Sequence, residues 1–188
     1  MANSRLAFLQ HLSAAAVIAC GVGVISTAAS AQMPGVENFH QVNDHIYRGA
    51  QPTTEGFQQL AKLGVKTVID LRETDSRSTT EKKVVEADGM RYVNIPLRGM
   101  SAPSSADVAK VLALFNDPKA GPVFVHCRRG ADRTGTVVAC YRISHDGWNN
   151  SKALTEAKTN GMSWMEVSMR KYVKHYQAPT PASTAVTQ

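Results

Sequence analysis

Apolar residues along this chain alternate between short continuous runs and helical spacing, a pattern typical of alternating strands and helices. The expected strands are residues 67–71, 91–95 and 122–125, preceded by an edge hairpin over 38–48. The expected helices are 54–63 (ended by Gly64), 80–88, one capped by Ser104 or Ser105, one opened by Arg133 that runs to His145, and one capped by Asn150 or Ser151 that runs to Ala157, before a closing segment over 164–176. This order predicts a single α/β domain whose central, mostly parallel sheet is flanked by helices.

The two ends of the chain differ in composition from the predicted domain. Residues 1–31 contain one charged residue, Arg5, then an apolar stretch, and finish with the small residues Ala29-Ser30-Ala31. We predict that this segment is a signal peptide, so that the domain spans 32–177 and is periplasmic or secreted. The alternatives are an uncleaved membrane anchor or a lipid on Cys20. Residues 178–188 are rich in Pro, Ser, Thr and Ala and predict a disordered tail.

The charge of the chain restricts its partners only loosely. The 188 residues carry 21 Lys and Arg against 15 Asp and Glu, a formal net charge of +6. The basic residues do not cluster with aromatic ones, so nucleic-acid binding is not expected. Membrane association is expected only if the N-terminal segment is retained or lipidated, and the protein is expected to be a monomer. No histidine or acidic cluster has the spacing of a ligand set, so we predict no metal and no cofactor.

The most informative residues are His126-Cys127-Arg128-Arg129-Gly130-Ala131-Asp132-Arg133-Thr134, which follow a short apolar run. A strand, a loop and a helix N-terminus make an anion site from backbone N–H groups and the helix dipole. The same field favours a thiolate at Cys127, which would attack phosphorus. Arg133 can grip two phosphate oxygens, and Thr134 can donate a proton to the departing sulfur. His126 would support the loop, and residues 128–133 would bind the phosphate.

At this point the chain resembles the cysteine-dependent protein tyrosine and dual-specificity phosphatases, whose His-Cys-x5-Arg-Ser/Thr signature it carries in full. The segments 46–52, 67–72 and 94–96 are similar to bacterial dual-specificity-like members and to atypical plant and fungal ones. The resemblance implies hydrolysis of a phosphomonoester through a phosphocysteine intermediate on Cys127. It also implies a proton-donating Asp on an upstream loop.

That loop, residues 98–105, contains no carboxylate in this chain. Two candidates for the acid remain. Asp132 lies within the phosphate loop, and phosphate and thiolate charge would favour its protonated form while Arg133 would oppose it. Asp107 lies in the first turn of a predicted helix, which favours the charged form and makes helix capping a sufficient role. We therefore prefer Asp132 and keep Asp107 as the alternative acid.

The substrate is less specified than the reaction. A phosphorylated protein, on tyrosine or on serine and threonine, is the first expectation. The basic pair Arg128 and Arg129 also suits small molecules with several phosphates, such as inositol phosphates, phosphoinositides or a nucleotide-type compound. A phosphate-binding module without catalysis is the third hypothesis, which the intact signature disfavours.

Three further residues are expected to be structural. Cys140 lies several turns along the helix from Cys127, so we predict a core cysteine and not a disulfide partner. Arg72 and Arg98 end strands near the loop and are expected to form salt bridges in preference to contacting substrate.

Overall fold

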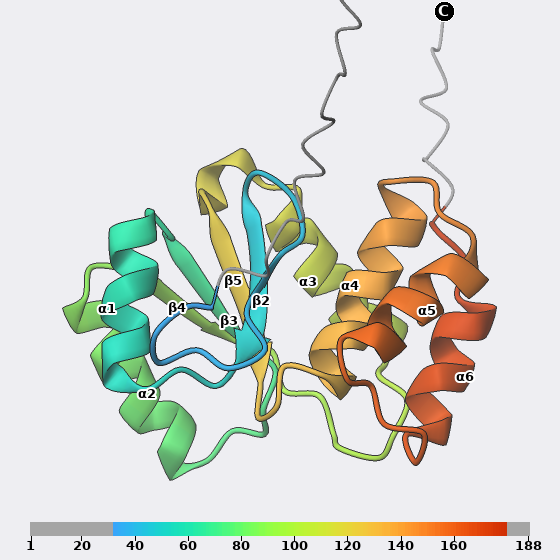
Figure 1. Cartoon of the computed structure of the whole chain (residues 1–188), viewed down its shortest axis with the longest axis horizontal. Coiled ribbons are helices and arrows are strands. Elements are labelled where there is room, and N and C mark those ends of the chain that lie inside the picture. Colours follow the sequence, from blue (N-terminus) through green and yellow to red (C-terminus); the bar gives the residue numbers. More distant parts are fainter. Residues whose placement is uncertain (1–31, 180–188) are drawn as a thin grey trace, which may run out of the picture.

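The computed structural model describes residues 32–179, and it contains one five-stranded sheet (Figure 1). The strands in chain order are β1 (His40–Gln41), β2 (Ile46–Ala50), β3 (Thr67–Asp70), β4 (Arg91–Asn94) and β5 (Val123–Cys127). Their spatial order is β1-β2-β5-β3-β4, and only the β1–β2 pair is antiparallel. The predicted mostly parallel sheet and its edge hairpin are confirmed.

Helices cover both faces of the sheet. The helices are α1 (Thr54–Leu63), α2 (Ser76–Ala87), α3 (Ser105–Phe115), α4 (Asp132–Ser144), α5 (Asn150–Thr159) and α6 (Val167–His175), with a 3-10 turn η1 (Pro118–Ala120). Figure 1 shows α1 and α2 on one face and α3 to α6 on the other. The core is accordingly divided, with one buried cluster around Leu60 and Phe124 and another around Val125 and Tyr141. The sheet is therefore buried on both sides, as its continuous apolar strands require.

Most predicted elements match the structure within one or two residues. Helix 54–63 has the predicted bounds, and Gly64 ends it with a φ of 96°, a left-handed conformation that favours glycine. Ser104 is the N-cap of α3, since its hydroxyl accepts a hydrogen bond from the Asp107 amide. The predicted strand at 122–125 continues through His126 to Cys127.

The predicted start of the second helix is wrong. This helix, α2, begins at Ser76, four residues before the predicted Thr80. Asp75 caps it, because its carboxylate accepts hydrogen bonds from the Arg77 and Ser78 amides. The Ser78 hydroxyl in turn accepts a hydrogen bond from the Asp75 amide. The usual sequence sign of such a reciprocal cap is Glu or Gln at the third position, and the serine here does not give that sign.

A smaller correction concerns the start of α5. Its cap is Asn149, whose side chain accepts from the Lys152 amide, and not Asn150 or Ser151. The closing segment 164–176, for which no secondary structure was predicted, contains α6 from Val167 to His175.

The predicted signal peptide, residues 1–31, and all of the predicted tail beyond residue 179 lie outside the described residues. Between residues 32 and 179, no helix combines the length and apolar character needed to span a bilayer.

Candidate active site

The carboxyl ends of the four parallel strands meet at one edge of the sheet, and Cys127 ends the middle strand there. The loop 128–131 follows, and α4 begins directly at Asp132. Ligands of open α/β sheets bind at this edge, where loops from several strands converge. The topology therefore places the whole predicted signature at the expected end of the sheet.

The cysteines at residues 127 and 140 are both free and buried. Cys140 is fully buried in α4 within the apolar cluster, and this burial raises the pKa of its thiol. The prediction of a core cysteine in place of a disulfide partner is confirmed. Cys127, in contrast, sits beside a helix N-terminus and an arginine-rich loop.

Backbone contacts from β2 hold the phosphate loop. Gly130 has a φ of 66°, and a Cβ there would lie 2.3 Å from the Gly49 carbonyl carbon. The glycine is thus required by the close approach of β2. Arg48, which is buried, donates from Nη2 to the Gly130 carbonyl oxygen at 2.6 Å. Burial lowers the pKa of Arg48 to about 10.

Arg133 lies on the first turn of α4 with its guanidinium among loops from neighbouring strands. Its Nη1 donates to the Leu97 carbonyl at 3.2 Å and to the Leu71 carbonyl at 3.5 Å. The same nitrogen lies 4.0 Å from Oε2 of Glu73, which is mostly exposed. These contacts use one of the guanidinium nitrogens and leave the other donors available to an oxyanion.

Thr134 is fully buried, and its hydroxyl has no hydrogen-bond partner among the described residues. A buried hydroxyl without a partner is costly, so its position one residue after Arg133 calls for an explanation. Donation to sulfur in the reaction, as the sequence predicts, would give this hydroxyl a partner.

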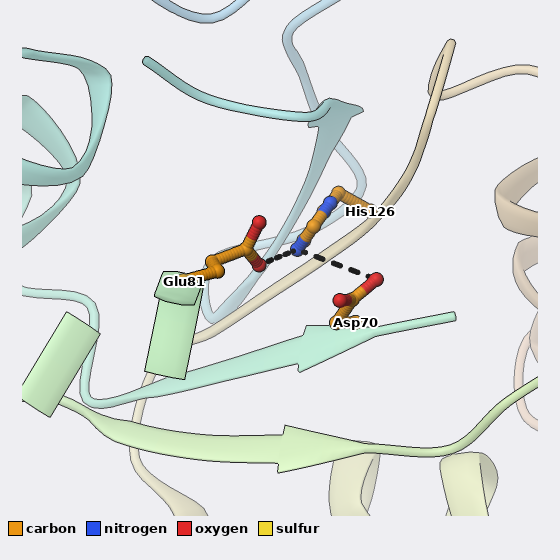
Figure 2. Close-up of side chains that lie close together, drawn as sticks. All are labelled: Asp70, Glu81 and His126. Carbon is orange, nitrogen blue, oxygen red and sulfur yellow. Dashed lines mark ion pairs between the residues drawn. The ribbon is translucent and has the colours of Figure 1, made fainter. Parts of the chain in front are cut away.

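His126 is held from behind the loop by a buried charged cluster. Its Nε2 lies 2.8 Å from Oε1 of Glu81 on α2 and 3.9 Å from Oδ1 of Asp70 at the end of β3 (Figure 2). The ring also stacks on Phe124 with centroids 5.7 Å apart. The residue directly before the nucleophile is thereby fixed by two strands and a helix.

Arg72 neutralises the carboxylates of this cluster. Its Nη2 donates to Asp70 at 2.7 Å and to Glu81 at 2.6 Å, and its Nε donates to Asp70 at 2.9 Å. Burial alone would raise the pKa of Asp70, but the hydrogen bonds and charge of Arg72 outweigh it and lower that pKa. The predicted salt-bridging role of Arg72 is confirmed. Arg98 is exposed and forms no ion pair among the described residues.

The ligand atoms of Asp70, Glu81 and His126 lie within 4.8 Å of one another, close enough to share a metal ion. The donor set fits a cation poorly, because the Arg72 guanidinium already occupies the space between the two carboxylates. A metal ion bound there would have to displace the buried ion pairs of Arg72 with Asp70 and Glu81. The geometry favours a positioning role for the cluster.

Asp132 braces the loop with both carboxylate oxygens. Oδ2 forms an ion pair with Nη2 of Arg129 at 2.5 Å, and Oδ1 accepts a hydrogen bond from the Ser163 amide at 2.8 Å. Asp132 thus ties the first turn of α4 to the segment that precedes α6. Its side chain is mostly buried, at 11 % exposure.

A carboxylate that the sequence did not single out, Glu166, lies close to Asp132. Glu166 is buried, and its Oε2 has no hydrogen-bond partner in the described part of the chain. Burial, and next the charge of Asp132, raise the pKa of Glu166, while Arg129, Arg133 and a backbone hydrogen bond from Met100 oppose the rise. Met100 belongs to the carboxylate-free loop.

The Asp107 carboxylate is occupied by hydrogen bonds within the first turn of α3. It accepts from Lys110 Nζ at 2.8 Å and from the Ser104 hydroxyl at 2.7 Å. These two bonds lower the pKa of Asp107 and so favour the charged form. A proton donor needs the opposite.

The exposed arginines border a hollow beside the loop. A cavity of about 710 Å³ is lined by Glu37, Asn38, Arg128, Arg129, Ala131 and residues 159–161. Asn38 donates to the Arg129 carbonyl at 3.2 Å and to the Asn160 carbonyl at 3.1 Å, and so joins the rim to the phosphate loop. Arg128 itself is exposed and unpaired with acidic groups among the described residues.

Sequence reasoning missed Glu81 and Glu166, and it did not assign Arg48 a role. Each lies far from the signature in sequence, so only the fold brings it to the loop. The sequence offers no local signal for the two glutamates, because Glu81 lies in a largely polar helix and Glu166 precedes α6.

Comparison with known proteins agrees with this geometry. A model of the family described as "DSP-PTPase phosphatase fused to NAD+ Kinase" matches residues 25–175. The dual specificity protein phosphatase TpbA of Pseudomonas aeruginosa is 32% identical over 175 residues, covering 86% of this chain and 76% of TpbA. Inositol diphosphatase DSP3 of Arabidopsis thaliana is 30% identical over 134 residues, covering 69% of this chain and 65% of DSP3.

A solved structure of TpbA shares the fold. The crystal structure of a Cys-to-Ser variant of TpbA in complex with phosphotyrosine is similar with a TM-score of 0.64 and 27% identity. The superposition covers 73% of this chain and 83% of that one.

Proposed function

Because the chain belongs to the DSP-PTPase family of cysteine-dependent phosphatases, we propose that it hydrolyses phosphomonoesters through a phosphocysteine on Cys127. The observation that carries the proposal is the place of a buried, free cysteine at the end of the middle strand and at the N-terminus of α4. Backbone N–H groups and the helix dipole favour both a thiolate and a bound phosphate there.

In the first step the Cys127 thiolate attacks phosphorus while the bond from phosphorus to the leaving oxygen breaks. Arg133 binds two phosphate oxygens through the guanidinium donors that are not bonded to the Leu71 and Leu97 carbonyls. In the second step water attacks the phosphocysteine and the thiolate departs. The Thr134 hydroxyl donates to the departing sulfur, which gives its buried oxygen a partner.

The first proton goes to the leaving oxygen and comes from a carboxyl group near the loop. Asp132, the candidate preferred from the sequence, and Glu166 lie near the phosphate loop, whereas hydrogen bonds from Lys110 and Ser104 lower the pKa of Asp107.

The mechanism is tested by replacing the two cysteines separately. Cys127→Ser should abolish turnover of p-nitrophenyl phosphate yet still bind phosphate, because the loop amides and Arg133 remain. Cys140→Ala is the matched control, and it should lower stability but keep turnover. Unchanged turnover in Cys127→Ser, measured with purified protein of verified mass, contradicts the proposal.

A phosphorylated protein is the substrate class that we propose first. TpbA is a dual specificity protein phosphatase, and its Cys-to-Ser variant binds phosphotyrosine. Phosphotyrosine peptides should therefore be turned over faster than inositol phosphates when both are compared at equal concentration.

A small molecule with adjacent phosphates is the second candidate, supported by the cavity beside exposed Arg128 and by similarity to an inositol diphosphatase. Arg128→Ala separates the candidates. If the natural substrate carries a second phosphate, this change should raise KM for an inositol diphosphate much more than for a phosphotyrosine peptide. Equal effects on both substrates favour the phosphoprotein.

We also propose that the enzyme works outside the cytoplasm, on the strength of the leader-like residues 1–31. Mass spectrometry of protein recovered from a periplasmic fraction should find Gln32 as the first residue. An intact or lipidated N-terminus on protein recovered with the membrane fraction would instead indicate membrane anchoring.

A further inference from the structure

Two carboxyl groups lie together beside the phosphate loop, and their surroundings differ. Asp132 is matched on both oxygens, by Arg129 and by the Ser163 amide. Glu166 has a buried Oε2 without a partner among the described residues. When two neighbouring carboxyl groups compete for one proton, the group with fewer donors facing it holds that proton.

From this arrangement we propose that Glu166 is the proton donor to the leaving group, a proposal that rests on the phosphocysteine mechanism above. Asp132 then has a different task. It pairs with Arg129 and fixes the 163–166 segment against α4.

The groups that face Glu166 come from three elements. Asp132 and Arg133 belong to α4, Arg129 to the phosphate loop, and the Met100 backbone to the loop after β4. From α6 itself, the Arg170 backbone amide donates a hydrogen bond to the Glu166 carbonyl oxygen. The Arg170 guanidinium donates instead to the Trp164 carbonyl oxygen. Burial and Asp132 raise the pKa of Glu166 against the opposing arginines, which is the direction that a proton donor needs.

The position of Glu166 also answers the absence of an acid from residues 98–105. The backbone of Met100, in this loop, is among the groups that lower the pKa of Glu166, so the glutamate lies near the carboxylate-free loop. Glu166 is the N-cap residue of α6, and its amide donates to the Ser163 carbonyl. Since Ser163 is in turn bound by Asp132, the glutamate is fixed relative to the loop that holds Cys127.

The proposed step balances as follows in atoms and charge. As the bond from Cys127 Sγ to phosphorus forms, the bond to the leaving oxygen breaks, and that oxygen takes the proton from the Glu166 carboxyl group. The resulting carboxylate then removes a proton from the attacking water, and the Cys127 thiolate leaves. Glu166 ends the cycle protonated.

Leaving groups of different basicity test the assignment. Glu166→Gln should lower kcat/KM for phenyl phosphate by about 100-fold or more, because a poor leaving group depends on protonation. The loss should be much smaller for p-nitrophenyl phosphate, whose leaving group needs no proton. Glu86→Gln, an exposed glutamate on α2, is the matched control and should change neither rate.

The pH profile gives a second readout that a purely structural role would not produce. In the unchanged protein, kcat/KM for phenyl phosphate should fall as the pH rises through the pKa of Glu166. This fall should be absent in Glu166→Gln. If Glu166→Gln does not fold, Glu166→Ala with added formate replaces it, and formate should restore turnover of phenyl phosphate.

Equal losses on both substrates in Glu166→Gln would overturn the proposal. So would a leaving-group-dependent loss in Asp132→Asn that Glu166→Gln lacks, and so would an unchanged pH profile. These outcomes leave the phosphocysteine mechanism standing, because that mechanism is tested separately by Cys127→Ser.

Discussion

Two pairs of acidic residues flank the nucleophile, and they are built for different tasks. Asp70 and Glu81 share the Arg72 guanidinium. Both carboxylates face His126, the residue before Cys127, in a buried cluster (Figure 2). At the start of α4, Asp132 pairs with the partly exposed Arg129, and Glu166 lies within the influence of the Arg129 and Arg133 charges without an ion pair of its own among the described residues.

The difference between the pairs lies in how the charge is balanced. In the Asp70–Glu81 pair every carboxylate has a cation within hydrogen-bond distance, and the pKa of Asp70 is lowered. In the Asp132–Glu166 pair only Asp132 has a cation within hydrogen-bond distance, and the pKa of Glu166 is raised. A matched pair fixes structure, whereas an unmatched one holds a proton that the reaction can use.

The largest expected effect comes from breaking the matched pair. Asp70→Asn leaves part of the charge of buried Arg72 uncompensated, which should lower the free energy of unfolding by about 3 to 5 kcal/mol. Urea denaturation measures this. The exposed Lys82–Glu86 pair is the control, and Glu86→Gln should cost less than about 1 kcal/mol. A loss below 1 kcal/mol for Asp70→Asn would remove the distinction between the pairs.

Breaking Asp132 should have a smaller, mixed effect. Asp132→Asn loses the ion pair with Arg129 but keeps an oxygen for the Ser163 amide, so stability should fall by about 1 kcal/mol. Turnover of phenyl and p-nitrophenyl phosphate should fall by the same factor, because Asp132 positions the loop and does not supply the proton. A selective loss on phenyl phosphate would reverse the roles of Asp132 and Glu166.

The pH dependence of stability should differ in sign between the pairs. The lowered pKa of Asp70 contributes stability above the ordinary carboxyl range, and this is lost as the pH falls through the lowered value. The raised pKa of Glu166 acts in reverse, since stability declines as the pH rises through it. The midpoint temperature of thermal unfolding should therefore be higher for Glu166→Gln than for the unchanged protein at neutral pH. In acid the two midpoints should be equal. The opposite order would contradict a protonated Glu166.

The smallest effect is expected at Asp107, a first-turn residue of α3 that belongs to neither pair. Asp107→Asn should change the free energy of unfolding by no more than about 0.5 kcal/mol, because its bonds to Ser104 and Lys110 lie at the surface. Both phosphate esters should be hydrolysed at the original rate. A leaving-group-dependent loss here would restore Asp107 as the acid.

The sequence predicted what is local and missed what depends on tertiary packing. The segment from His126 to Thr134 could be read directly, because strand, loop and helix start are adjacent and their chemistry depends on spacing. Helix 54–63 was equally plain, since a threonine cap and a terminal glycine mark both ends.

Glu81 and Glu166 could not be found in this way. Glu81 reaches His126 only because α2 begins at Ser76, and the serine-based cap hid that start. Glu166 reaches the loop through bonds between Ser163 and Asp132, which join segments 31 residues apart. The carboxylate-free loop signalled that an acid was needed elsewhere, but its source depended on the fold.

The most direct test of the account is to stop the reaction within one turnover and measure the mass of the peptide that contains Cys127. With p-nitrophenyl phosphate, Glu166→Gln should form the intermediate but hydrolyse it slowly, so Cys127 should carry one phosphoryl group. The same peptide from Cys127→Ser should carry none. Turnover without phosphorylated Cys127, or a phosphoryl group on another residue, would contradict the mechanism.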